Sequence, residues 1–171
     1  MPMLSISTPA VHVSFSQSIS RLEERRLQSE SQIPEIARPT SVAERWASYV
    51  LGACKAERDL KTIGIWARQV AVSYTTLCES CRLIDVQPRQ ARDFARVLRI
   101  LTLPAFDFRQ LATFLDISDT RTLHSILQKA GFEHHATSSG HVSVASFLDH
   151  QQFIVRQNPG LRIIRDIFSL A

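Results

Sequence analysis

Two short segments of the chain combine an apolar stripe with a polar opposite face. The apolar positions are Leu77 and Cys81 in the first segment, and Leu123 and Leu127 in the second. Residues four positions apart share one face of an α-helix. The opposite faces carry hydroxyl, carboxylate, imidazole and guanidinium groups, which can bond to base edges in a DNA major groove. The candidate base-contacting residues are Tyr74, Thr75, Thr76 and Glu79 in the first segment, and Thr120, Arg121, His124 and Ser125 in the second.

Between the two segments runs a row of four arginines at spacings of 3, 4 and 3, which a helix aligns along one side. The row is suited to phosphate contact or to bracing the helix against the rest of the protein. One alternative is a solvated helix face whose positive charge is partly offset by Asp93. Another is burial of Arg96 in an ion pair. The phosphate-contacting or bracing candidates are Arg82, Arg89, Arg92, Arg96 and Arg99.

Motifs for catalysis and metal binding are missing from the sequence. It contains no Gly-rich phosphate loop, no G-x-S-x-G and no H-E-x-x-H. Cys78 and Cys81 have the spacing of zinc ligands, but no second pair completes a four-ligand site. We therefore predict no enzymatic activity, no catalytic residue, no metal and no cofactor, and we expect the cysteines to be buried, reduced thiols.

The distribution of charge favours a polyanionic partner. The chain of 171 residues has a net charge of +4, and residues 42–132 carry all of this excess. A solvated, Arg-rich surface is the alternative explanation. No apolar run approaches the roughly 18 residues that span a bilayer, and the N-terminus lacks a secretory pattern. We predict a cytoplasmic protein that does not bind membranes.

The elements that must position these residues are all expected to be helical. Apolar residues recur at helical spacing from Val42 onward, and no segment has the alternation of a strand. Residues 1–41 are rich in serine and interrupted by prolines, which predicts a largely disordered arm. Residues 42–132 form the main domain, and residues 133–171 form a C-terminal helical extension. We predict helices over residues 42–53, 61–71, 74–82, 88–101, 108–115, 119–129, 144–156 and 161–170, with Asp59 capping the second.

The same helix pair occurs twice in the main domain. Residues 61–71 and 108–115 are each followed by a short turn and a second helix, and a small residue, Ala67 or Ala112, stands where the helices of a pair approach. Two helices joined in this way are typical of a helix-turn-helix unit. The linking helix over residues 88–101 then joins the two units.

This pattern resembles the DNA-binding domain of AraC-type transcription regulators. The resemblance covers roughly residues 42–132 and is carried by small residues, turn serines, core apolars and the linker positions: Ala67, Ser73, Leu77, Pro88, Arg96, Ala112, Ser118, Leu123 and Leu127. It implies an all-α fold with two helix-turn-helix units that enter two successive major grooves of double-stranded DNA. It therefore implies a sequence-specific transcription regulator.

An alternative function remains beside this one. A helical adaptor would keep the helix-turn-helix frame without specific DNA contacts and would bind a protein. In either case the N-terminal arm or the final helix offers a surface for a protein partner or for self-association.

Overall fold

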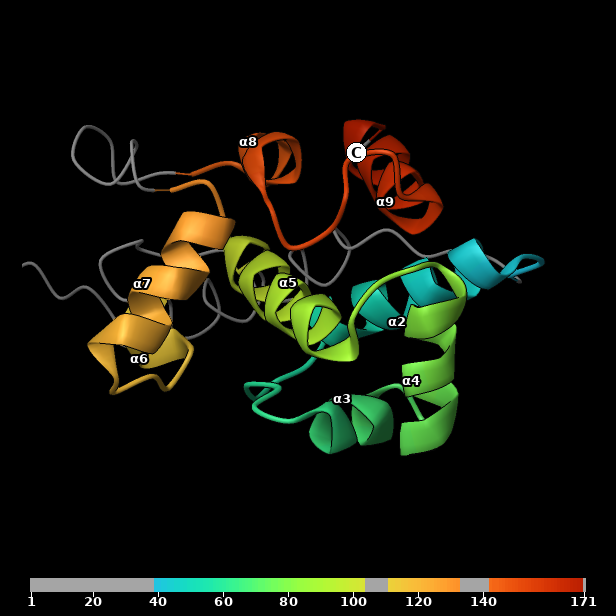
Figure 1. The fold of residues 1–171 in the computed structure, drawn as a ribbon, viewed down its shortest axis with the longest axis horizontal. Coiled ribbons are helices and arrows are strands. Elements are labelled where there is room, and N and C mark those ends of the chain that lie inside the picture. Colours follow the sequence, from blue (N-terminus) through green and yellow to red (C-terminus); the bar gives the residue numbers. More distant parts are fainter. Residues whose placement is uncertain (1–38, 104–110, 133–141, 171) are drawn as a thin grey trace, which may run out of the picture.

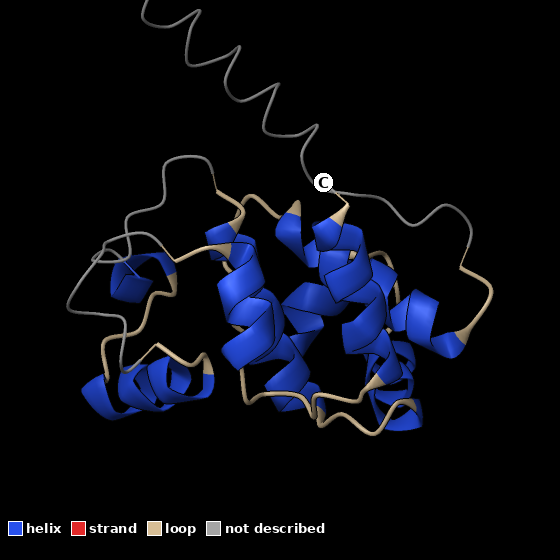
Figure 2. Cartoon of the chain, turned by 90° about the horizontal axis from the view of Figure 1, so that it is seen from above, coloured by secondary structure: helices blue, strands red, loops and turns tan. Residues whose placement is uncertain are grey.

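The computed structural model describes residues 39–103, 111–132 and 142–170. Helices and loops make up these ranges, with no strand among them, which confirms the all-α prediction (Figures 1 and 2). The predicted arm lies outside the described residues except for its last three positions. Of these, Ser41 accepts a hydrogen bond from the Glu44 amide and caps the first helix.

Within the described ranges the boundaries of the helices follow the apolar pattern closely. They are α2 (Val42–Cys54), α3 (Ile63–Gln69), α4 (Tyr74–Leu83), α5 (Pro88–Leu101), α6 (Leu111–Phe114), α7 (Thr120–Lys129), α8 (Val144–His150) and α9 (Pro159–Ser169).

Helix α5 is the central element of the fold (Figure 1). It contacts α2, α3, α4 and α8, and Pro88 at its first turn supplies a backbone angle suited to a helix start. In Figure 1, α6 and α7 lie to one side of it, whereas α3 and α4 lie below. The central helix therefore lies between α3 and α4 on one side and α6 and α7 on the other (Figure 1).

A row of aromatic rings forms the middle of the core. The ring of Phe94 in α5 lies 6.3 Å from that of Trp46 in α2 and 5.3 Å from that of Phe147 in α8. Phe132, just after α7, lies 6.0 Å from Phe147. All four side chains are buried. Because large rings contribute much of the buried apolar area, this row joins the central, N-terminal and C-terminal helices into one core.

The C-terminal helices pack against the main domain. Helix α9 contacts α2 and α8, and a side chain at Gly160 would collide with the ring of Trp46. The Asn158 amide nitrogen donates to the Ile84 carbonyl at 2.6 Å, while its oxygen accepts from the first amides of α9. The final helix is therefore held against the first helix pair.

Several predicted boundaries were wrong. The helix predicted over residues 61–71 spans only Ile63–Gln69, and the helix predicted over residues 161–170 begins two residues earlier, at Pro159. The helix expected over residues 144–156 ends at His150, because Gln151 has extended backbone and its side chain bonds both backbone groups of Ile154. Thr62, not Asp59, caps α3. For the helix expected over residues 108–115, the structure describes only 111–115, and there α6 spans Leu111–Phe114.

Candidate nucleic-acid interface

The two helix pairs, α3–α4 and α6–α7, close with the same backbone turn. In the first, the Val72 amide donates to the Ala67 carbonyl at 2.9 Å; in the second, the Ile117 amide donates to the Ala112 carbonyl at 3.0 Å. The residue before each donor, Ala71 or Asp116, has a positive φ. This is the bonding pattern with which many helices end at a left-handed residue. The two alanines therefore occupy equivalent places in the pairs.

The second helix of each pair begins at a side-chain cap. Ser73 Oγ accepts from the Thr76 amide at 3.0 Å, and Asp119 Oδ2 accepts from the Thr122 amide at 3.0 Å. Such caps satisfy amides that have no partner inside the helix. One residue, Ser118, separates the second turn from its cap, so the second connection is one residue longer than the first.

All eight candidate base-contacting residues are exposed. In α4 the side chains of Leu77 and Cys81 are buried, as predicted, so the polar face points outward. The Thr76 hydroxyl is bonded to Ser73, and Tyr74 contacts the thiol of Cys78, which raises the pKa of the phenol. The groups of α4 best placed for an external partner are therefore Thr75 and Glu79.

The buried position of α7 differs from the prediction. Ile126 is buried, whereas Leu123 and Leu127 are only half-buried. The inward face of α7 is thus centred on Ile126, one residue before Leu127 and three after Leu123. The exposed face still contains the four predicted residues, Thr120, Arg121, His124 and Ser125.

Among the predicted arginines, Arg96 is a buried residue that braces the fold. Its guanidinium donates to both carboxylate oxygens of Asp59, at 3.0 and 2.7 Å, and also to the Leu115 carbonyl at 2.6 Å. Its exposure is only 6%. Because Asp59 precedes α3 and Leu115 follows α6, one buried side chain ties the two helix pairs together. An exposed ion pair between Lys61 and Asp116 joins the same two segments.

Arg99 and Arg92 also brace α5. Arg99 is buried and donates to the Ala56 and Glu57 carbonyls at 2.7 and 2.8 Å, and burial lowers its pKa. Arg92 donates to Asp93 and to the Lys61 carbonyl. A solvated stripe of four arginines is therefore the wrong interpretation for Arg96 and Arg99. Arg89 and Arg82, in contrast, are exposed.

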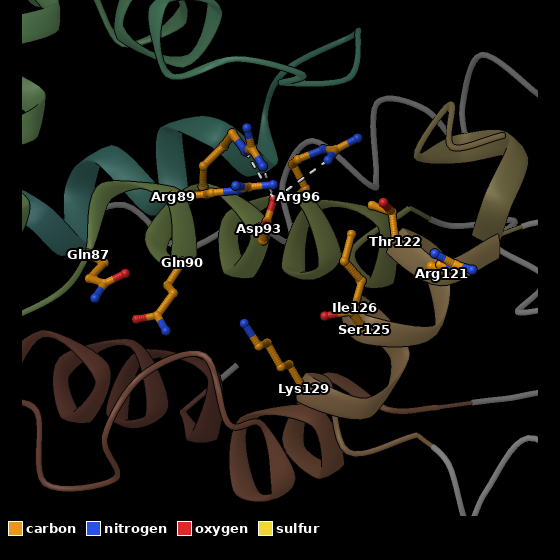
Figure 3. A pocket seen from close by; sticks show the side chains of 11 residues that line it. Gln87, Arg89, Gln90, Asp93, Arg96, Arg121, Thr122, Ser125, Ile126 and Lys129 are labelled. Carbon is orange, nitrogen blue, oxygen red and sulfur yellow. Dashed lines mark hydrogen bonds and ion pairs between the residues drawn. The ribbon is translucent and has the colours of Figure 1, made fainter. Parts of the chain in front are cut away.

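A groove of about 500 Å³ lies between α5 and α7 (Figure 3). It brings together five predicted residues from two distant parts of the sequence: Arg89, Arg92, Arg96, Arg121 and Ser125. Side chains of both helices extend into it, and Lys129 reaches from α7 toward α5 (Figure 3). The groove is lined by Gln87, Arg89, Gln90, Arg92, Asp93 and Arg96 on one side, and by Arg121, Thr122, Ser125, Ile126 and Lys129 on the other.

The groove is electropositive. Its one carboxylate, Asp93, bonds Arg92 and lies 3.7 Å from Arg96. Sequence analysis missed Lys129, Gln87 and Gln90. Lys129 stands four residues after Ser125 and eight after Arg121, so its helical spacing could have shown that it shares their side of α7.

The three cysteines are buried, and none of them forms a disulfide. Burial raises the pKa of Cys54 to about 12 and that of Cys81 to about 11. Protonated thiols are poor nucleophiles and poor metal ligands. Across the described ranges, no group of three or more His, Cys, Asp or Glu side chains is arranged to hold a metal.

Comparisons with protein-family models, curated proteins and solved structures found no match to this chain. No helix in the described ranges has the length and apolar character that crossing a bilayer requires.

Proposed function

We propose that this chain is a sequence-specific, double-stranded DNA-binding transcription regulator that acts in the cytoplasm and is a divergent relative of AraC-type proteins. The observation that carries the proposal is a combination found twice: a turn, a side-chain cap and an exposed polar face on the helix that follows. Equivalent bonds to the Ala67 and Ala112 carbonyls precede two capped helices, α4 and α7, which both have exposed polar faces. Short helices of this kind fit the major groove.

The links between the helix pairs support simultaneous binding by α4 and α7. Arg96 bonds both Asp59 and Leu115, and Lys61 pairs with Asp116. These contacts limit the movement of one pair against the other. Two recognition helices bind one DNA site well when their separation is set before binding, because less freedom is then lost on association.

We expect residues that contact the DNA phosphates and residues that contact the base edges to have different roles. Arg121, at the exposed start of α7, is the candidate for bidentate contact with guanine. Arg89 and Lys129 line the same groove and carry charges suited to phosphates. Base contacts give sequence preference, whereas phosphate contacts give affinity and salt dependence.

Selection of bound sequences from a random pool of DNA duplexes tests the proposal directly. We expect one enriched sequence, with an affinity that falls as salt rises. Arg121→Ala should lose about 1–3 kcal/mol at that sequence and much less on random DNA. The charge-matched control is Arg162→Ala, an exposed position in α9. Absence of any enriched sequence would contradict specific DNA binding.

A further inference from the structure

We propose that the groove between α5 and α7 is a binding site for neighbouring phosphate groups, including those of a free di- or triphosphate. The site is defined by its own geometry, and only its use on DNA rests on the proposed function. Free anions and the DNA backbone share this chemistry, so experiments with each can separate the two sources.

The charges in the groove are arranged for an anion that bridges two helices. Arg89 stands on the α5 wall, while Arg121 and Lys129 stand on the α7 wall. Among the described residues, no acidic side chain pairs with any of these three. An anion that contacts these three side chains would relieve the repulsion between like charges across the groove.

The floor of the groove is rigid and already neutralised. Asp93 receives two hydrogen bonds from Arg92, at 3.0 and 2.5 Å, and Arg96 is fixed by Asp59. Because guanidinium groups contact Asp93, its carboxylate repels an incoming anion less than an unpaired carboxylate would. A fixed floor also lowers the entropy lost on binding.

The start of α5 adds to the positive potential. Gln87 is its N-cap but makes no side-chain cap bond, and the first turn has no acidic residue. Gln87, Arg89 and Gln90 belong to this turn and line the groove. The partial positive charge of a helix N-terminus favours anions, and it reinforces the three cationic side chains here.

The size of the groove favours more than one phosphate. A volume of about 500 Å³ lies inside the range of roughly 300–1,000 Å³ typical of small-ligand sites. Two or three linked phosphates can contact both walls, whereas a single phosphate would contact one. We therefore expect tighter binding of pyrophosphate and tripolyphosphate than of orthophosphate or sulfate.

Occupation of the groove has a consequence for α7. Arg121 and Ser125 line the groove and also belong to the predicted base-contacting face. An anion held between Arg121 and Lys129 would compete with DNA for the same side chains. The groove would then lower DNA affinity when such anions are abundant.

Calorimetric titration of the full chain with pyrophosphate tests the site. We expect saturable binding that weakens at least tenfold in the double variant Arg89→Ala/Lys129→Ala. The control variant Arg156→Ala/Arg162→Ala removes two exposed charges outside the groove and should bind normally. Circular dichroism verifies that both variants fold. No saturable binding, or an equal loss in the control, would overturn the free-anion site.

The same variants on a random-sequence DNA duplex separate the sources. Loss of both ligands in the groove variant supports a site that serves both. A second outcome is that the groove variant loses DNA binding while the wild-type protein does not bind pyrophosphate. This outcome overturns the free-anion site and leaves the proposed function intact. Pyrophosphate binding by a protein that binds no DNA supports the groove and contradicts the proposed function.

Discussion

The pairs α3–α4 and α6–α7 share a turn but are anchored to the molecule in different ways. Helix α4 buries four residues and packs against α2, α3 and α5, whereas α7 buries Ile126 alone. The segments around α7 also enter the core, through Leu111, Leu115, Ala130 and Phe132. Two polar links add to the attachment of the second pair: the bond from Arg96 to the Leu115 carbonyl and the Lys61–Asp116 ion pair. The two second helices therefore differ in how much of their own length is buried, although both pairs join one hydrophobic core.

This contrast predicts unequal local stability. Segments with few buried apolar contacts open at lower free energy than segments within the core. We expect α7 to exchange its amide hydrogens faster than α4.

The largest effect is expected from removing the side chain that joins the pairs. Arg96→Ala leaves Asp59 largely buried without its partner, which should cost about 3–5 kcal/mol of the free energy of unfolding. Urea unfolding followed by circular dichroism measures this loss. Arg89→Ala, on the exposed side of the same helix, is the matched control and should change stability by less than about 0.5 kcal/mol.

Fluorescence adds a test of coupling, because Trp46 and Trp66 both lie in the half of the molecule that contains the first pair. In Arg96→Ala, we expect the fluorescence and dichroism transitions to separate. Coincident transitions with a small loss of stability would show that Arg96 does not join the pairs.

Truncating the apolar side chains of the two second helices should give the next largest difference. Leu77 is fully buried in α4, so Leu77→Ala should cost about 2–5 kcal/mol. Leu123 is half-buried in α7, and Leu123→Ala should cost on the order of 1 kcal/mol. Equal losses in chemical denaturation would refute the contrast between the two anchors.

The smallest expected effect is the loss of the Asp119 helix cap at low pH. The hydroxyl and amide of Thr122, followed by the Arg121 amide, lower the pKa of Asp119 in the folded protein. The cap therefore stabilises α7 above the ordinary carboxyl value of 3.8 and is lost as pH falls through the lower, folded value. Thr62 and Ser73 cap the first pair with hydroxyls, which do not titrate in this range.

Amide exchange between pH 6 and 3 measures this difference. We expect α7 to lose protection toward pH 3, relative to the intrinsic exchange rate, while α4 retains it. Asp119→Ser keeps a cap without the titrating group and should remove the acid sensitivity of this cap. Parallel loss of protection in both helices would contradict the assignment.

The sequence predicted the helices well because apolar spacing is a local signal. The stripe of α5 and the capping serine of α4 are visible in neighbouring residues. The role of Asp59 was not predictable in this way, since its partner Arg96 lies 37 residues away. A carboxylate before a helix is compatible with a cap or with a distant ion pair, and only the fold distinguishes them.

The candidate site was predictable only in part for the same reason. Helical spacing located the exposed faces of α4 and α7. The groove depends on the approach of α5 to α7, and Lys129 acquires its significance there through tertiary position. All three apolar residues of α7 have helical spacing, but the deeper burial of Ile126 than of Leu123 and Leu127 depends on how α7 is rotated against the core.

The glycine at position 160 has a consequence for biosynthesis. It allows α9 to rest directly on Trp46, so a nascent polypeptide that still lacks residues 159–169 leaves one side of that indole uncovered, while Phe94 stacks on the ring from α5. The amino-terminal helices, although translated first, therefore complete their packing only after the last helix has left the ribosome. Until then, the exposed ring offers a surface on which a chaperone can act.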